Sequence, residues 1–339
     1  MILKLRQIFL AALFCVIAIA AADAQTLKSI QARGHILCGV SQGLPGFSQD
    51  DGKGNWSGFD VDFCRALSAA IFNDPSKVQF VPLNAAERFD ALKDKKIDIL
   101  SRNSTWTISR EADYGIVFAG ITYYDGQGFM VRKSRNVMTS MDLQNVKICV
   151  QTGTTTEINI TDYFNQNGMR FEIVKFPEVT SLLKGYDAGN CDVLTADVSQ
   201  LYALKLETTK PGEHTILADI ISKEPLGPAV RVGDEQWLGI VKWTHFALLN
   251  AEELGVGAKN IDDALKSEKP DIKRLTGRDG DYGEKLGLSR DWVVRVVRHT
   301  GNYGEVFERN IGVKSRVGIP LGLNHLWSAG GIQYAPPIR

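Results

Sequence analysis

Three parts of the sequence carry groups that could bind a small charged molecule. Arg110 has a planar guanidinium, whose parallel N–H groups can hold a carboxylate; the competing interpretation is a surface arginine that pairs with a neighbouring acid. The turn Gly153–Thr155 precedes an expected helix, and the free N–H groups of a helix start bind anions. Asp197 follows a strand-like run, which places it at the carboxyl edge of a sheet, where open α/β folds bind ligands. Thr154 and Asp197 could also be ordinary helix caps.

Sequence motifs of several large enzyme classes are absent. The chain contains no G-x-x-x-x-G-K-[ST], no G-x-G-x-x-G after a strand, no H-E-x-x-H and no G-x-S-x-G. The histidines show no metal-ligand spacing, Asp60-Val-Asp62 is expected at a helix start, and Asp279-Gly-Asp281 lacks the later ligands of a calcium loop. We therefore expect neither a metal site nor a cofactor.

Length and charge narrow the class of protein. At about 150 residues per domain, 339 residues predict two domains or one large one. The 39 basic and 39 acidic residues balance to a net charge of +0, whereas nucleic-acid-binding proteins usually carry a basic excess. We therefore expect no nucleic-acid partner.

The N-terminus has the parts of a secretory signal peptide. Lys4 and Arg6 are followed by an apolar run over residues 8–22, and Ala22-Asp23-Ala24 is a small-residue cleavage site. The apolar run is shorter than the ~20 residues of a spanning helix. We therefore predict cleavage after residue 24 and export of the mature chain.

Four cysteines remain after that cleavage, and export makes disulfide bonds plausible. Four cysteines allow three pairings, which sequence alone does not distinguish. We favour Cys38–Cys64 and Cys149–Cys191, because each bridge would then stay inside one local strand–helix unit.

Strands and helices are expected to alternate twice along the chain. This pattern predicts parallel sheets with helical crossovers. The expected strands are 35–40, 78–81 and 97–100 in the first third, and 146–150, 171–176 and 192–195 in the second. The expected helices begin near residues 59, 85, 154 and 180 and, in the last third, near 237 and 290.

Local signals mark ends and connections of these elements. Thr154-x-x-Glu157 is typical of a capping box, and Ser289 is a suitable N-cap. Gly-rich segments at 124–128 and 226–228 are interpreted as two crossings of a hinge. Residues 301–339, rich in Gly, Pro and aromatic residues, are expected to form an extension packed on the surface.

Taken in order, several strings resemble the polar amino-acid family of periplasmic solute-binding proteins, which serve ABC importers, and within it the general L-amino-acid-binding subgroup. The resemblance covers about residues 33–255. The strings that carry it are ILCGVSQGLPGF (36–47), GFDVDFCRAL (58–67), LKDKKIDI (92–99), SRNSTWTISR (101–110), QTGTTTE (151–157), GNCDVLTAD (189–197) and the ending QYAPPIR (333–339).

The resemblance implies a two-lobe α/β fold of the type II periplasmic-binding-protein class, with two parallel or mixed sheets joined by a two-strand hinge. Residues 1–24 would be the signal peptide and 25–127 the first part of lobe 1. Residues 128–228 would form lobe 2. Residues 229–339 would complete lobe 1 and add a C-terminal helical extension.

The resemblance also assigns roles at the site. In the family, Arg110 grips the α-carboxylate of an amino acid, Thr155 supplies a backbone donor beside Thr154, and Asp197 holds the α-ammonium. Asn103 and Thr105 offer oxygens to that ammonium. Trp106 either covers the ligand side chain or packs within the lobe, and Arg102 could meet the side chain of glutamate or aspartate.

The implied function is capture of L-amino acids with broad specificity in the periplasm of a Gram-negative bacterium and delivery to the permease subunits of an ABC importer. The expected protein is a monomer and not an enzyme. Two alternatives stay open: a periplasmic prephenate or arogenate dehydratase on the same fold, and a detached sensor module of a signalling receptor. A dehydratase needs a spare acid or base in the cleft, and we identify none.

Overall fold

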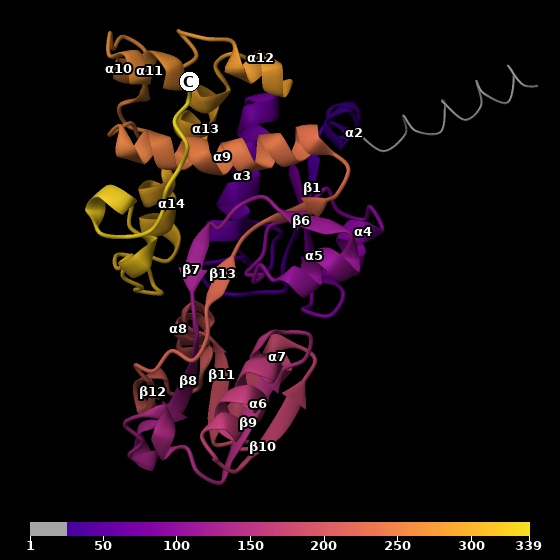
Figure 1. Ribbon diagram of the computed structural model, residues 1–339, viewed down its shortest axis with the longest axis vertical. Coiled ribbons are helices and arrows are strands. Elements are labelled where there is room, and N and C mark those ends of the chain that lie inside the picture. The colour runs from indigo at the N-terminus through magenta and orange to yellow at the C-terminus, as the bar shows by residue number, and fades with distance from the viewer. Residues whose placement is uncertain (1–25) are drawn as a thin grey trace, which may run out of the picture.

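The computed structural model describes residues 26–339, so the predicted signal peptide at 1–24 lies outside the described residues. The chain forms two α/β lobes stacked along the long axis, each built on a five-stranded sheet (Figure 1). This is the predicted two-lobe arrangement. None of the described helices is long and apolar enough to cross a membrane.

Lobe 1 contains the first sheet, with strand order β4-β1-β5-β14-β6. The first three strands run parallel, and β14 is antiparallel to both of its neighbours. The strands are β1 (Ile36–Ser41), β4 (Val78–Leu83), β5 (Ile99–Leu100), β6 (Ile116–Phe118) and β14 (Ala229–Arg231). The helices of its N-terminal part are α2 (Thr26–Arg33), α3 (Phe59–Phe72), α4 (Arg88–Lys93) and α5 (Ile108–Tyr114).

Lobe 2 repeats this plan with the strand order β10-β9-β11-β8-β12. The first three strands are again parallel, as the alternating pattern predicts, while β8 is antiparallel to β11 and β12. The strands are β8 (Gln127–Arg132), β9 (Val146–Gln151), β10 (Phe171–Phe176), β11 (Val193–Asp197) and β12 (His214–Ile216). The helices are α6 (Thr156–Gln166), α7 (Val179–Asp187) and α8 (Val198–Glu207).

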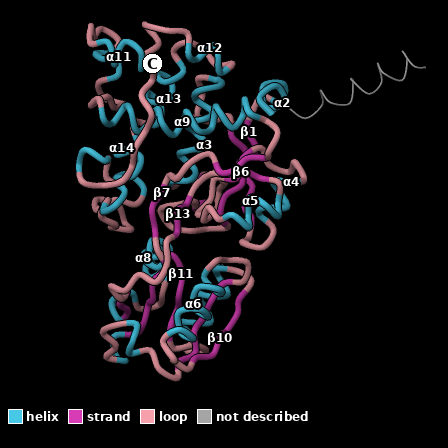
Figure 2. The backbone as a smooth tube through the Cα atoms, in the orientation of Figure 1, coloured by secondary structure: helices cyan, strands magenta, loops and turns pink. Residues whose placement is uncertain are grey.

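Two short strands connect the lobes. Strand β7 (Tyr123–Asp125) carries the chain into lobe 2, and β13 (Glu224–Leu226) carries it back. They pair antiparallel, with Glu224 opposite Asp125, and run side by side between the lobes (Figures 1 and 2). A pair of extended segments that connects two lobes can act as a hinge.

The last third packs on lobe 1 and is mainly helical. The long helix α9 (Glu235–Glu253) crosses α3, and the chain end runs back over α9 (Figure 1). The expected surface extension contains one regular helix that the sequence pattern did not predict, α14 (Tyr303–Asn310), which begins with a capping box of Asn302 and Glu305. The other helices are α10 (Ile261–Ala264), α11 (Pro270–Leu275), α12 (Tyr282–Leu286) and α13 (Trp292–Thr300).

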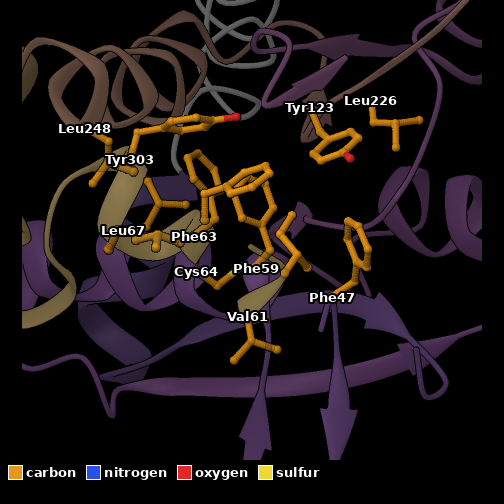
Figure 3. Close-up of a cluster of buried hydrophobic side chains, with 14 of the residues drawn as sticks. Phe47, Phe59, Val61, Phe63, Cys64, Leu67, Tyr123, Leu226, Leu248 and Tyr303 are labelled. Atoms are coloured by element: carbon orange, nitrogen blue, oxygen red, sulfur yellow. The ribbon is translucent and has the colours of Figure 1, made fainter. Parts of the chain in front are cut away.

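Residues of this extension also form hydrogen bonds to the segment that contains the hinge strand β7. Tyr303 donates a hydrogen bond from its hydroxyl to the carbonyl oxygen of Thr122 (2.9 Å), and the amide of Asn324 bonds both the N–H (2.7 Å) and the C=O (3.1 Å) of Tyr124. In Figure 3, Tyr123 and Leu226 from the two hinge strands lie in the same cluster of buried side chains as Phe59 and Tyr303. The lobe 1 ends of both hinge strands are therefore anchored to the core of lobe 1.

Two local predictions are wrong. Helix α6 begins at Thr156, and the hydroxyl of Thr154 donates instead to the carbonyl of Gln151 (2.7 Å), while Glu157 pairs with Lys175. The predicted capping box therefore does not form. Helix α13 begins at Trp292 after Asp291, so Ser289 lies in the preceding turn and is not its N-cap.

Both favoured disulfide pairs are present. Cys38 of β1 bonds Cys64 of α3, and Cys149 of β9 bonds Cys191, just before β11. Each bridge stays within one lobe, so neither restricts movement of one lobe relative to the other.

Removing the lobe 2 bridge should lower stability without changing the binding site. The chain-entropy model gives ~3–4 kcal/mol for a loop of this length, so we expect the Cys149→Ala/Cys191→Ala double variant to lose about that much free energy of unfolding. Urea denaturation at 25 °C measures it, and ligand titration of the folded variant is the control. An unchanged denaturation midpoint would show that the bridge contributes nothing.

Candidate functional site

A small cavity lies between the lobes, next to the hinge. Its volume is about 20 Å³, enough for one or two water molecules. Every side chain that lines it is polar or charged. The lining residues are Arg88, Arg102, Asn103, Thr105 and Arg110 from lobe 1 and Gln151, Thr154, Thr155, Thr156, Asp197 and Gln200 from lobe 2.

Arg110 lies in the first turn of α5, and its side chain is buried. Thr107 caps this helix by accepting the N–H of Arg110, and the Arg110 guanidinium donates to the carbonyl of Thr105 (2.5 Å) and lies over the ring of Phe89. The neighbouring Glu111 accepts the N–H of Phe118 instead of pairing with it. The structure therefore does not support a surface ion pair, and the guanidinium is held at the cavity. Burial lowers the pKa of Arg110, although Asp197 and Glu224 favour its charged form.

Asp197 ends β11 in lobe 2 and faces the same cavity. Its side chain makes no capping hydrogen bond to α8, although the residue occupies the N-cap position. Burial raises the pKa of this carboxyl well above its usual range, and Asp125 and Glu224 add to the shift, while Arg110 and Arg88 oppose it. The carboxyl group is therefore buried without a capping role. These are the properties expected of a group that binds a cationic ligand.

The segment after β5 supplies the lobe 1 wall. The side-chain amide of Asn103 donates to Gln200 of lobe 2 (3.2 Å), and its own oxygen is buried with no hydrogen-bond partner. The hydroxyl of Thr105 donates to Glu224 (2.5 Å). Trp106, in contrast, does not line the cavity: its ring stacks on Phe118 at 5.7 Å between centroids and is partly exposed.

The lobe 2 wall is the turn that leads into α6. Gly153 has a φ of +75°, and a Cβ there would lie 3.1 Å from the backbone of Ala86 in lobe 1. Glycine thus provides both the left-handed turn and the close approach of the two lobes. Thr155, the residue before α6, donates its hydroxyl to Glu224 (2.9 Å).

Glu224 of the hinge strand β13 joins both walls, and the sequence analysis missed it. The carboxylate is buried and accepts hydrogen bonds from Thr105 of lobe 1 and from Thr155 and Asn159 of lobe 2. A glutamate in an expected hinge crossing gives no sequence signal of this role, because these partners come from two distant parts of the chain.

Arg88 is the second residue that the sequence analysis missed. It is the first residue of α4, only 1% exposed, and lines the cavity. Burial lowers its pKa, as do the nearby Arg102 and Arg110. One sequence signal was available. A basic residue in the first turn of a helix opposes the helix dipole, so an arginine at this position indicates a role other than stabilising the helix.

The donor groups at the cavity are not those of a metal site. No group of three or more His, Cys, Asp or Glu side chains that could hold a metal ion occurs within residues 26–339. The donor set at the cavity, three guanidinium groups with one carboxylate, suits a charged organic ligand.

Comparison with known proteins places this architecture in a family. Residues 36–242 match the bacterial extracellular solute-binding proteins, family 3. The chain is 52% identical over 338 residues to the general L-amino acid-binding periplasmic protein AapJ of Rhizobium johnstonii, with 99% of each chain covered. It is 46% identical to the glutamate/glutamine/aspartate/asparagine-binding protein BztA of Rhodobacter capsulatus, covering 94% of this chain and 95% of that one.

A solved structure is similar over nearly the whole length. An ABC transporter periplasmic binding protein of Brucella ovis, with glutathione bound, superimposes with a TM-score of 0.92 at 51% identity and covers 93% of this chain and 100% of its own. The fold, the paired hinge strands and the family match agree. This chain belongs to the family 3 bacterial extracellular solute-binding proteins.

Proposed function

We propose that this chain binds L-amino acids of several kinds in the cleft between its lobes and delivers them to an ABC importer. One observation carries the proposal: Arg110 of lobe 1 and Asp197 of lobe 2, both buried, face one cavity from opposite sides. Within the part of the chain that the structure describes, neither is in an ion pair closer than 4 Å. A zwitterion, with its carboxylate and ammonium a few bonds apart, is complementary to this pair.

Six polar residues of the cavity then have a role in binding the two charged ends of an amino acid. Arg110 binds the α-carboxylate, which also receives N–H groups from the turn at Thr154 and Thr155. Asp197 binds the α-ammonium together with the oxygens of Asn103 and Thr105. We assign Trp106 to packing of lobe 1, because it stacks on Phe118 away from the cavity.

Ligand binding would be coupled to closure of the hinge. The cavity is smaller than an amino acid, and the Asn103–Gln200 hydrogen bond joins the lobes directly, while Glu224 of the hinge accepts from both lobes. The lobes must therefore separate to admit a ligand, which then stabilises the closed form by contacts to both. The proposed division at 25–127, 128–228 and 229–339 places each boundary near the end of a hinge strand.

The relatives support the same class of function. The Rhizobium and Rhodobacter proteins are described as amino-acid-binding, and the Brucella protein was solved with glutathione, a peptide with a free amino-acid end. We propose a periplasmic location after cleavage of the signal peptide, a monomer, the permease subunits as partners, and no catalytic activity of its own.

Calorimetric titration of the mature protein tests this proposal. The protein is unfolded and refolded to remove bound ligand, then titrated with a panel of L-amino acids and glutathione. We expect saturable 1:1 heats with several chemically different amino acids. Heat from none of them would contradict the proposal, and prephenate turnover would then test the dehydratase alternative.

A further inference from the structure

The C-terminal extension contacts lobe 2 as well as the hinge. In the loop after α14, the guanidinium of Arg316 lies 3.1 Å from a carboxylate oxygen of Glu207, the last residue of α8, at the hinge end of lobe 2 (Figure 1). Neither residue lines the cavity. At the rise of an α-helix, Glu207 lies about 15 Å along α8 from Asp197. The ion pair is therefore a contact between the lobes outside the proposed binding site.

The loop that carries Arg316 is fixed to lobe 1. Just before it, Asn310 at the end of α14 donates a hydrogen bond to Asp62 of α3 (2.7 Å). Within the loop, Val317 is buried, and a Cβ at Gly46 of lobe 1 would lie 2.6 Å from its side chain. A loop that is close-packed in this way moves with the lobe on which it packs.

The acidic partner belongs to the core of lobe 2. Helix α8 packs against β8 and β11, and its Leu201 and Leu204 are buried. Charged groups in contact cannot approach further, so a rotation of the lobes that changes the Arg316–Glu207 distance must lengthen it. Since the attraction falls with distance, the pair favours the arrangement seen here. This is the closed one, because the cavity between the lobes measures only about 20 Å³.

The same extension determines where the hinge can bend. Asn324 bonds both backbone groups of Tyr124 in β7. Pro225 of β13 is paired with Tyr124, and its carbonyl accepts the N–H of Trp106 from lobe 1 (2.8 Å). The hinge is thus bonded to lobe 1 on both edges at this level. Lobe 2 therefore rotates relative to an extension that stays with lobe 1.

We propose that the loop 311–321 of the C-terminal extension is a second contact between the lobes, in which Arg316 and Glu207 stabilise the closed form. The inference rests on the proposed function, because closure determines affinity only if the ligand binds between the lobes. It goes beyond that function by assigning two positioning residues that touch no ligand. Since they change the population of the closed form, they change the affinity for every ligand by the same factor.

Charge reversal at each position and an exchange of the two charges test the contact. Arg316→Glu and Glu207→Arg each replace an attraction by a repulsion between partly exposed groups. We expect each single variant to bind L-glutamate, L-glutamine and L-alanine ~3- to 10-fold more weakly, by the same factor for all three. The double variant Arg316→Glu/Glu207→Arg restores an ion pair and should bind within ~2-fold of the unmodified protein. Calorimetric titration measures all affinities.

Salt dependence separates the ionic contact from a change in packing. At about 1 M NaCl, charges interact over only about 3 Å. Each single variant should then bind as tightly as the unmodified protein does at the same salt concentration. A packing defect would persist at high salt and would contradict the proposal.

The matched control is Arg298→Glu. Arg298 forms an exposed ion pair with Asp262 at 2.7 Å, but both residues belong to lobe 1. Its reversal should leave the affinity for all three amino acids unchanged, and circular dichroism verifies that all variants are folded.

The outcomes separate this contact from the proposed function. Unchanged affinity in both single variants would refute the contact, as would a loss that the double variant does not reverse. A loss for one ligand alone would place the effect in the cleft and refute it as well. Absence of any amino-acid binding by the unmodified protein would instead refute the proposed function, and this inference with it.

Discussion

Replacing Arg110 by alanine is expected to weaken the binding of every amino acid ligand by at least ~100-fold. A bidentate arginine–carboxylate contact contains two charged hydrogen bonds, each worth ~1.5–3 kcal/mol, and a 100-fold loss corresponds to about 2.7 kcal/mol. Since the α-carboxylate is common to all amino acids, the loss should not depend on the ligand side chain. Calorimetric titration with one acidic, one neutral and one basic amino acid measures it.

A matched variant separates this loss from damage to lobe 1. Arg65 also lies over a phenylalanine ring, that of Phe80, at 5.9 Å, and belongs to the same lobe but not to the cavity. Arg65→Ala should bind all three amino acids with unchanged affinity. Near-native affinity in Arg110→Ala would remove Arg110 from the site, whereas a loss for the acidic ligand alone would assign it to the side chain of the ligand.

The elements could be predicted where apolar periodicity determines them. Strand β10 matches the predicted range 171–176, and β11 ends at Asp197, so the position of this carboxylate at the sheet edge follows from the sequence pattern. Arg110 was assigned from its chemistry and the resemblance, and the structure places it at the same cavity. The pattern is informative here because β11 is buried throughout, whereas β10 carries its two charged residues at its exposed positions.

The parts that could not be predicted depend on contacts between distant segments. Arg88 is charged within an otherwise ordinary helix start, and its buried guanidinium lies over Phe89 and donates to the carbonyl of Gly153 from lobe 2. The side-chain amide of Asn324 makes the two hydrogen bonds to the backbone of Tyr124 that a neighbouring strand would otherwise make. The two residues are 200 positions apart in the sequence. Such contacts leave no periodic signal, so neither the burial of Arg88 nor the anchoring of the hinge by the C-terminal extension was visible in the sequence.

Asp197 leads to a prediction about pH. Burial, followed by Asp125 and Glu224, raises the pKa of this carboxyl well above its usual range, while Arg110 and Arg88 partly offset the shift. An α-ammonium group needs the ionised carboxylate, so binding should release protons from the fraction that is protonated. Affinity should therefore fall as the pH is lowered from 8 to 5, a range in which neither end group of a neutral amino acid titrates. Titrations in two buffers with different ionisation enthalpies measure the released protons.

Two variants test whether Asp197 is the titrating group. Asp197→Asn should bind at least ~10-fold more weakly at pH 8, as expected for the loss of a charged hydrogen bond, and should release no protons. Asp125 is the nearest control, because burial raises its own pKa to about 6 and its charge raises that of Asp197. Asp125→Asn should keep proton release but move it to lower pH. Undiminished proton release by Asp197→Asn would assign the titration to Asp125, and unchanged affinity at pH 8 would leave Asp197 without a role in the site.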